Sequence, residues 1–257
     1  MSRRHLTFAC DGSVLVGTLD EAPGTTGLLI VSGGNELRSG PWGGQAALAA
    51  QVAAAGHPVF RFDRRGVGDS EGANAGFRDS APDVAAALAA FRATCPGLAR
   101  FVAMGNCDAA SALMLAGGAG CDGLILTNPW TIEDDAAAPP PEVLRGHYRR
   151  RLTDPAALKR LLRGEVGLGS LVASLLGALR PAAPPSSLAQ ELATGLAQFS
   201  GPVRLLVAAA DRTGQSFCAA WDRNDPRIRR CEGATHSFVE PHARAWLLEQ
   251  VLEALIA

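Results

Sequence analysis

The sequence lacks several features that mark common classes of protein. Its formal net charge is −1, with 24 Lys and Arg against 25 Asp and Glu, so it has no surplus of positive charge for nucleic acid or an anionic membrane. It has no uninterrupted apolar run of about 18 residues, which a membrane-spanning helix would require. Its first residues lack the apolar core of a secretory signal peptide. We therefore expect a cytoplasmic protein with no membrane span and no nucleic-acid partner.

The cysteines also lack a pattern. Six are present, they are scattered, and no two form a C-x-x-C pair, which argues against both a zinc site and a disulfide framework. Most of them are expected to be small buried side chains. We expect no metal and no cofactor.

What the sequence does contain is a regular alternation of strand-like and helical segments. A chain of 257 residues with 47% hydrophobic and 19% charged residues suits one large α/β domain. Strand-like segments lie at residues 6–9, 14–19, 27–31, 58–63, 101–104, 123–127, 203–208 and 227–231, and helical patterns at 43–55, 83–93, 107–117, 216–221 and 243–256. Two initial strands followed by alternating units predict an eight-stranded, mostly parallel sheet with helices on both faces.

Residues 131–200 interrupt this alternation. They contain no clear strand pattern, and Pro-rich stretches at 136–141 and 180–187 flank the helical patterns between them. We predict an α/β core of residues 1–130 and 201–257, with 131–200 inserted as a helical lid over the carboxyl edge of the sheet. A helical excursion without a gating role is the alternative. The arginines of 147–152 and 159–163 could meet the phosphates of coenzyme A or of a carrier arm, although such a run is more often a solvated helix face.

The most informative segment is residues 101–116. A short apolar run leads into Gly105-Asn106-Cys107-Asp108-Ala109, and a helical pattern of small residues follows. A strand, a G-x-nucleophile-x-small turn and a helix are typical of a nucleophile elbow, here with Cys107 in the nucleophile position. A buried cysteine on an ordinary turn is the alternative interpretation. A helix N-terminus and a nearby histidine would favour the thiolate, which attacks esters and thioesters readily.

The base that activates this thiol is expected after it in the chain. Three histidines follow Cys107, and only His236 lies in a loop between the last strand and the last helix, where this arrangement delivers its general base. His147 falls in the basic part of the insertion and His242 begins the last helix, so both are expected at the surface.

Asp211 is the candidate for the acid that orients this base. It ends the strand that begins at Val203, and it could also cap the helix that follows. Asp222 and Asp225, in a polar loop further on, are weaker alternatives.

The oxyanion of an acyl-transfer reaction needs backbone N–H donors. The first would be the N–H of Asp108, and the second that of Gly34 or Asn35 in the glycine-containing loop after the third strand.

Taken in order along the chain, these features resemble the α/β-hydrolase superfamily. The chain is more narrowly similar to the exosortase A system-associated hydrolase 1 family of bacterial exopolysaccharide loci. The residues that carry this narrower resemblance are Gly33-Gly34 with Arg38-Ser39-Gly40, residues 62–72, 105–111, Thr127-Asn128-Pro129-Trp130, and residues 147–152 and 161–166. The resemblance implies a Cys-Asp-His triad and a cytoplasmic bacterial enzyme near cell-surface polymer biosynthesis, but no particular substrate. We take as candidate substrate contacts Arg38, Asn106, Trp130 and Tyr148.

We therefore expect an acyl hydrolase of the thioesterase or carboxylesterase type, with Cys107 as nucleophile, His236 as base and acid, and Asp211 as orienting residue. Its partner would be a small acyl ester or thioester, including one linked to coenzyme A or a carrier. Two alternatives stay open. The acyl group could pass from Cys107 to an alcohol or amine, or the fold could serve as a non-catalytic binding protein.

Overall fold

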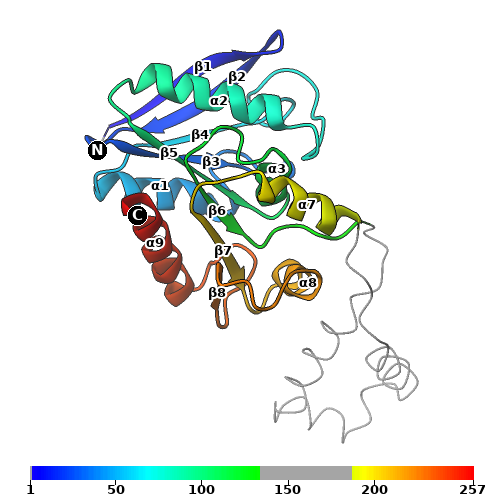
Figure 1. Cartoon of the computed structure of the whole chain (residues 1–257). Helices are drawn as coiled ribbons and strands as arrows, with labels where there is room; N and C mark the ends of the chain where they lie inside the picture. The colour runs from blue at the N-terminus through cyan, green and yellow to red at the C-terminus, as the bar shows by residue number, and fades with distance from the viewer. Residues whose placement is uncertain (1, 134–186) are drawn as a thin grey trace, which may run out of the picture.

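One eight-stranded sheet forms the centre of the molecule in the computed structural model, which describes residues 2–133 and 187–257 (Figure 1). Its strand order is β1-β2-β4-β3-β5-β6-β7-β8. The strands are β1 (Arg3–Cys10), β2 (Ser13–Asp20), β3 (Thr26–Val31), β4 (Val59–Phe62), β5 (Arg100–Asn106), β6 (Gly123–Thr127), β7 (Val203–Ala208) and β8 (Ile228–Cys231). Pairs β1–β2 and β2–β4 are antiparallel, and all others are parallel. The predicted eight-stranded, mostly parallel sheet is confirmed.

The order of the strands creates a crevice at the carboxyl ends of β3 and β5. From β3 the chain moves outward to β4 and then crosses back to place β5 on the other side of β3. Val31 of β3 lies opposite Gly105 of β5, so the loops that follow these two strands begin side by side. Ligands of open α/β sheets bind at such a switch point.

Helices cover both faces of the sheet. They are the 3₁₀-helix η1 (Pro41–Gly43) and the α-helices α1 (Gly44–Ala54), α2 (Ala81–Thr94), α3 (Asp108–Leu115), α7 (Ser187–Ala197), α8 (Arg212–Ala220) and α9 (Pro241–Ile256). Buried residues of α1 and α9 share one core cluster with Leu28 and Ile30 of β3. Those of α2, α3, α7 and α8 share the other with Leu29 and Val31. Alternate residues of β3 therefore serve the two faces, as a strand buried on both sides requires.

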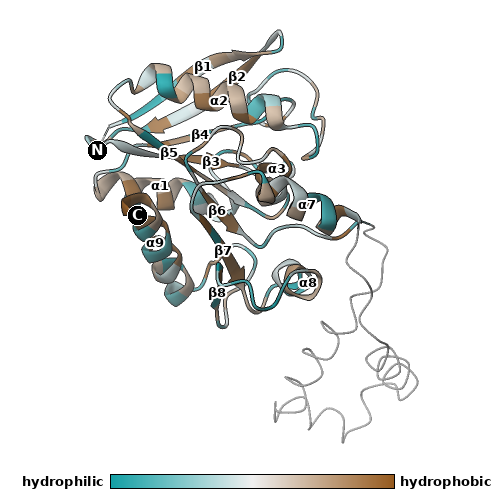
Figure 2. Ribbon diagram, viewed as in Figure 1, coloured by the Kyte–Doolittle hydropathy of each residue, from teal (hydrophilic) through white to brown (hydrophobic). Residues whose placement is uncertain are grey.

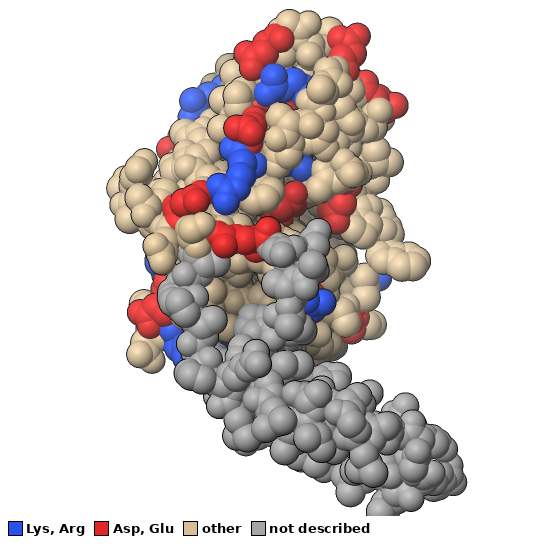
Figure 3. Space-filling model, turned by 90° about the vertical axis from the view of Figure 1, so that its right-hand side faces the viewer, with Lys and Arg blue, Asp and Glu red and all other residues tan. Residues whose placement is uncertain are grey.

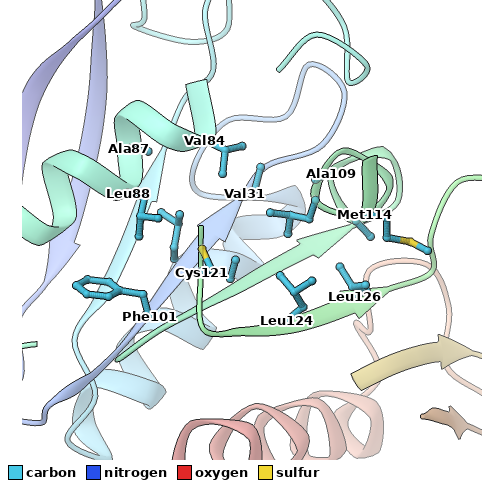
Figure 4. Packing of buried hydrophobic residues seen from close by; sticks show 14 of the residues in the cluster. Val31, Val84, Ala87, Leu88, Phe101, Ala109, Met114, Cys121, Leu124 and Leu126 are labelled. Carbon is cyan, nitrogen blue, oxygen red and sulfur yellow. The ribbon is translucent and has the colours of Figure 1, made fainter. Parts of the chain in front are cut away.

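The larger cluster fixes α3 on the sheet. Figure 4 shows Ala109 and Met114 of α3 beside Leu124 and Leu126 of β6, and all four are almost completely buried. In Figure 2 the central strands are mostly apolar, whereas α9 carries both polar and apolar residues, as a helix with one face in water should. None of the helices within the described ranges is long and apolar enough to cross a membrane.

Helix α7 belongs to this core. Its residues Leu188, Leu192 and Leu196 are at most 2% exposed and lie in the larger cluster. At its start the carboxylate of Glu133 accepts hydrogen bonds from the Ser187 hydroxyl and, at 2.7 Å, from the Leu188 N–H. The two described ends that flank residues 134–186 therefore meet. The predicted lid at 131–200 lies mostly outside the described residues, and its gating role stays a prediction.

Candidate active site

Cys107 occupies a strained turn between β5 and α3. Its backbone has φ 59° and ψ −125°, a conformation that costs a non-glycine residue free energy and is found at functional sites when its surroundings enforce it. Here the Cys107 N–H donates to the Thr127 carbonyl at 2.9 Å, and the Cys107 carbonyl accepts from the Trp130 N–H at 3.2 Å. The strand, turn and helix predicted for a nucleophile elbow are present.

Small residues allow this turn to form. A Cβ atom added to Gly105 would lie 2.7 Å from both the Ala109 carbonyl carbon and the Ala110 nitrogen. Ala109 and Ala110 are themselves fully buried against the sheet. The first turn of α3 therefore rests directly on the end of β5, which lifts residue 107 above the sheet edge.

Asp211 and His236 meet at the same edge. Asp211 caps α8, and its Oδ2 atom accepts hydrogen bonds from the Gly214 N–H and from His236 Nδ1, both at 2.9 Å. Burial raises the pKa of Asp211, but the hydrogen bonds from His236 and Gly214 outweigh it, so this pKa lies below its ordinary value. The cap and the histidine contact, both anticipated for Asp211, occur together.

His236 links this carboxylate to the thiol. Its hydrogen bond with Asp211 and a second with the Cys107 thiol raise the pKa of His236 to about 10, against the opposing effect of its burial. Both contacts favour the protonated ring. His236 is therefore placed to exchange a proton with the Cys107 thiol.

Asn106 and Asn128 both donate to the carbonyl oxygen of His236 and so fix the backbone of the loop that carries it. The sequence patterns do not assign this role to either residue. Asn128, fully buried and with φ 45°, donates from Nδ2 to the His236 carbonyl at 3.2 Å and to Asn106 Oδ1 at 3.2 Å. Its Oδ1 accepts from the Ala208 N–H at 2.8 Å. One side chain thus joins the ends of β6 and β7, the elbow and the histidine loop. In the sequence, the feature that marks Asn128 is its place in the Asn-Pro-Trp motif.

The loop after β3 is tied to the elbow by Asp108. The Gly34 N–H donates to both carboxylate oxygens of Asp108, each at 2.8 Å. Arg64, 2% exposed, donates to the Gly34 carbonyl at 2.5 Å and lies 3.7 Å from Asp108. Gly33 is required here, because a Cβ at this position would lie 2.4 Å from Asp108 Oδ1.

The hydrogen bonds between Gly34 and Asp108 affect which of the predicted oxyanion donors is available. The N–H of Gly34 already has the Asp108 side chain as its acceptor. Within the part of the chain that the structure describes, the N–H groups of Asn35 and Asp108 have no acceptor. Of the three predicted donors, Gly34 is therefore the one whose N–H group is already occupied.

The structure gives the remaining candidates other surroundings. The Arg38 guanidinium pairs with Asp63 and donates to Thr18 at 3.0 Å, so it braces the turn after β4. Asn106 lies at the elbow and bonds Asn128, whereas Trp130 meets Cys107 through its backbone. Tyr148 and His147 lie outside the described residues.

The weaker alternatives for the acid and the base have other partners. His242 hydrogen-bonds the Glu232 carbonyl at 2.9 Å. Asp225 pairs with Arg227 and accepts from the Trp221 indole, while Asp222 accepts from the Asn224 N–H.

The other cysteines differ from Cys107 in their surroundings. All six are free. Burial raises the pKa of the other five thiols, to about 12 at Cys121; the others are Cys10, Cys95, Cys218 and Cys231.

Among the residues in the described ranges, no group of three or more His, Cys, Asp or Glu could hold a metal ion. Figure 3 looks onto the side where the chain leaves β6, and there basic and acidic side chains are interspersed on the described surface.

Comparison with solved structures shows the same fold in several hydrolases. The α/β hydrolase GrgF from Penicillium sp. sh18 is 17% identical, with a TM-score of 0.64 and 100% of both chains covered. The Pyrococcus furiosus esterase Pf2001 is 14% identical, with a TM-score of 0.60 and 99% of this chain and 90% of that chain covered. XC6422 from Xanthomonas campestris, an α/β serine hydrolase without a lid, is 15% identical, with a TM-score of 0.62 and coverage of 100% and 97%.

Sequence comparison gives the family. No curated protein matches the chain. Residues 28–250, which include the elbow, Asp211 and His236, match the family described as the alpha/beta hydrolase family. The match spans most of the chain and includes the parallel strands from β3 to β8. The chain belongs to the alpha/beta hydrolase family.

Proposed function

We propose that this protein is an acyl hydrolase that uses Cys107 as a covalent nucleophile. The observation that carries the proposal is the arrangement of three residues at one sheet edge: Asp211 binds His236 at 2.9 Å, the Cys107 thiol contributes to the raised pKa of His236, and Cys107 lies on a strained turn at a helix N-terminus. A nucleophile, a base and an orienting acid in this relation are what acyl transfer through a covalent intermediate requires.

The first half of the reaction forms an acyl-cysteine. The thiolate of Cys107 attacks the carbonyl carbon of the substrate, and the carbonyl π electrons move to the oxygen. The N–H groups of Asp108 and Asn35 donate to this oxyanion. When the carbonyl re-forms, the bond to the leaving group breaks, and the imidazolium of His236 gives its proton to the departing oxygen or sulfur.

The second half releases the acid. Neutral His236 takes a proton from water as the water oxygen attacks the acyl carbon, and collapse of the tetrahedral intermediate expels the Cys107 thiolate. The thiolate and imidazolium pair is thereby restored. Esters and thioesters suit this nucleophile, because an alkoxide or thiolate is a better leaving group than the amide anion of a peptide or amide substrate.

Finer assignments rest on the sequence resemblance. We place the enzyme with the exosortase A system-associated hydrolases of bacterial exopolysaccharide loci, and in the cytoplasm. Thioesters of coenzyme A or of a carrier belong to the proposed substrate range through the arginines of 147–152 and 159–163, which lie outside the described residues. Acyl transfer to an alcohol or amine uses the same acyl-cysteine, and a non-catalytic binding role would use the same pocket.

A set of matched variants tests the proposal. Hydrolysis of p-nitrophenyl acetate and of an acetyl thioester is measured for wild type, Cys107→Ala and Cys218→Ala, which removes another free, partly buried thiol. Cys107→Ala should lower kcat/KM by about a thousandfold or more, whereas Cys218→Ala should retain activity. Retained turnover in Cys107→Ala would refute the assignment. Product analysis with added alcohols and amines separates hydrolysis from transfer.

A further inference from the structure

A cavity opens beside the elbow, on the face of the sheet that α1 and α9 cover. Its volume is about 170 Å³. Its apolar lining includes Met104 of β5, Leu48 of α1, Phe238 of the histidine loop and Leu247 of α9. Leu48, Met104 and Phe238 are at most 8% exposed, so this lining belongs to the protein core.

The cavity adjoins the candidate active site. Asn106 and Ser237 line it, and each directly adjoins a member of the proposed triad, Cys107 or His236. Glu36 lines it from the loop after β3. Burial raises the pKa of Glu36, and the charge of His236 opposes this, so the Glu36 carboxylate lies within electrostatic reach of the histidine.

The rim of the cavity carries an unusually exposed aromatic side chain. Trp42 lines the cavity, is 88% exposed and has φ 58°, a left-handed conformation that is strained for tryptophan. An exposed tryptophan held in strain at the edge of an apolar cavity is typical of a surface that contacts a ligand.

We propose that this cavity binds the acyl chain of the substrate, and that the chain is about six carbon atoms long. The inference rests on the proposed function and names its substrate class. A cavity of roughly 150 Å³ holds benzene, so the volume here fits a similar number of carbon atoms. Asn106 and Ser237 bring the cavity next to Cys107 and His236, which suits the acyl group that stays covalently attached while the leaving group departs.

The test is the dependence of kcat/KM on acyl length with one leaving group. For p-nitrophenyl esters, wild type should gain roughly threefold to fourfold per methylene from acetyl to hexanoyl and then lose activity for longer chains. Leu48→Phe fills the cavity and should lower the hexanoyl-to-acetyl ratio of kcat/KM by about tenfold or more. Ala50→Leu, on α1 outside the cavity lining, is the matched control and should leave the ratio unchanged.

A second variant and a binding measurement make the result decisive. If Leu48→Phe does not fold, Gly44→Leu replaces it, because Gly44 lines the cavity, has helical backbone angles and meets no atom within 4 Å of an added Cβ. An unchanged ratio in the cavity variant, or no chain-length dependence in wild type, overturns the proposal. If wild type hydrolyses no ester, the proposed function fails. Saturation-transfer NMR with hexanamide then tests the cavity alone. Transfer in wild type that the variant loses supports the proposal, and no transfer overturns it.

Discussion

At the scale of single residues, the site depends on side chains that serve the backbone and the chemistry at once. Asp211 uses one oxygen atom both to cap α8 and to hold His236. Asp108 begins α3 and, through its carboxylate, also fixes the Gly34 N–H. Each of these two carboxylates therefore stabilises the start of a helix or a loop and at the same time positions a group of the candidate site.

The raised pKa of His236 makes a testable contribution to stability. It is raised from 6.5 to about 10, chiefly by the hydrogen bond with Asp211, so the protonated ring stabilises the folded state. This contribution should be complete below pH 6.5, decline above it and vanish as pH passes about 10. Unfolding free energies of wild type and His236→Gln, compared from pH 6 to about 10.5, measure it. His242→Gln is the control, and a difference independent of pH would contradict the assignment.

Asn128 should act as a positioning residue. In Asn128→Asp the acceptor for the Ala208 N–H remains, but the donor to the His236 carbonyl becomes a second acceptor. Leaving buried groups unpaired costs about 1–3 kcal/mol, so kcat should fall roughly tenfold to a hundredfold with little change in KM. The exposed Asn224→Asp is the control. A change in unfolding midpoint without the drop in kcat would reduce Asn128 to a purely structural role.

At the scale of elements, the elbow requires the close contact of α3 with β5. Gly105→Ala places a Cβ atom 2.7 Å from the backbone of Ala109 and Ala110, and these atoms cannot move without shifting the helix. We expect a loss of about 1–3 kcal/mol in unfolding free energy, measured in urea, together with reduced turnover. Gly97→Ala, where an added Cβ meets nothing within 4 Å, should change stability by less than about 0.5 kcal/mol. Equal effects of the two substitutions would contradict this account of the elbow.

The elements that the sequence predicts well are those that local pattern determines. The eight strands, the turn at Cys107 and the place of His236 after the last strand follow from runs of apolar residues and from chain order. Helix boundaries are less accurate: α8 begins at Arg212 instead of 216, because the Asp211 side chain caps the Gly214 N–H and so extends the helix. The sequence offers Asp211 as a possible cap, but hydrophobic periodicity alone does not show where the capped helix begins.

The parts of the site that could not be predicted depend on contacts between distant residues. The bond from Gly34 to Asp108 spans 74 positions, and that from Asn128 to the His236 carbonyl spans 108. Either side chain is compatible with many partners until the sheet order is known. The sequence also predicts Arg38 as a substrate contact, and the structure pairs it with Asp63 because the loops after β3 and β4 lie together.

At the scale of the whole molecule, the core should be independent of residues 134–186. Glu133 and the start of α7 are hydrogen-bonded, and α7 packs into the main cluster. Joining 133 to 187 with a short Gly-Ser linker should therefore leave a cooperative unfolding transition within about 5 °C of wild type. Loss of cooperative unfolding would show that the core needs this segment. Turnover of a short ester by the same variant tests the predicted lid.

The most direct test of the central claim is the intact mass of the protein after mixing with an activated short-chain ester. The account predicts one added acyl mass on wild type, none on Cys107→Ala, and an adduct that decays as free acid is released. Its decay products with added alcohols or amines separate hydrolysis from acyl transfer. Equal adducts on both proteins, or turnover without any adduct on Cys107, would contradict the account.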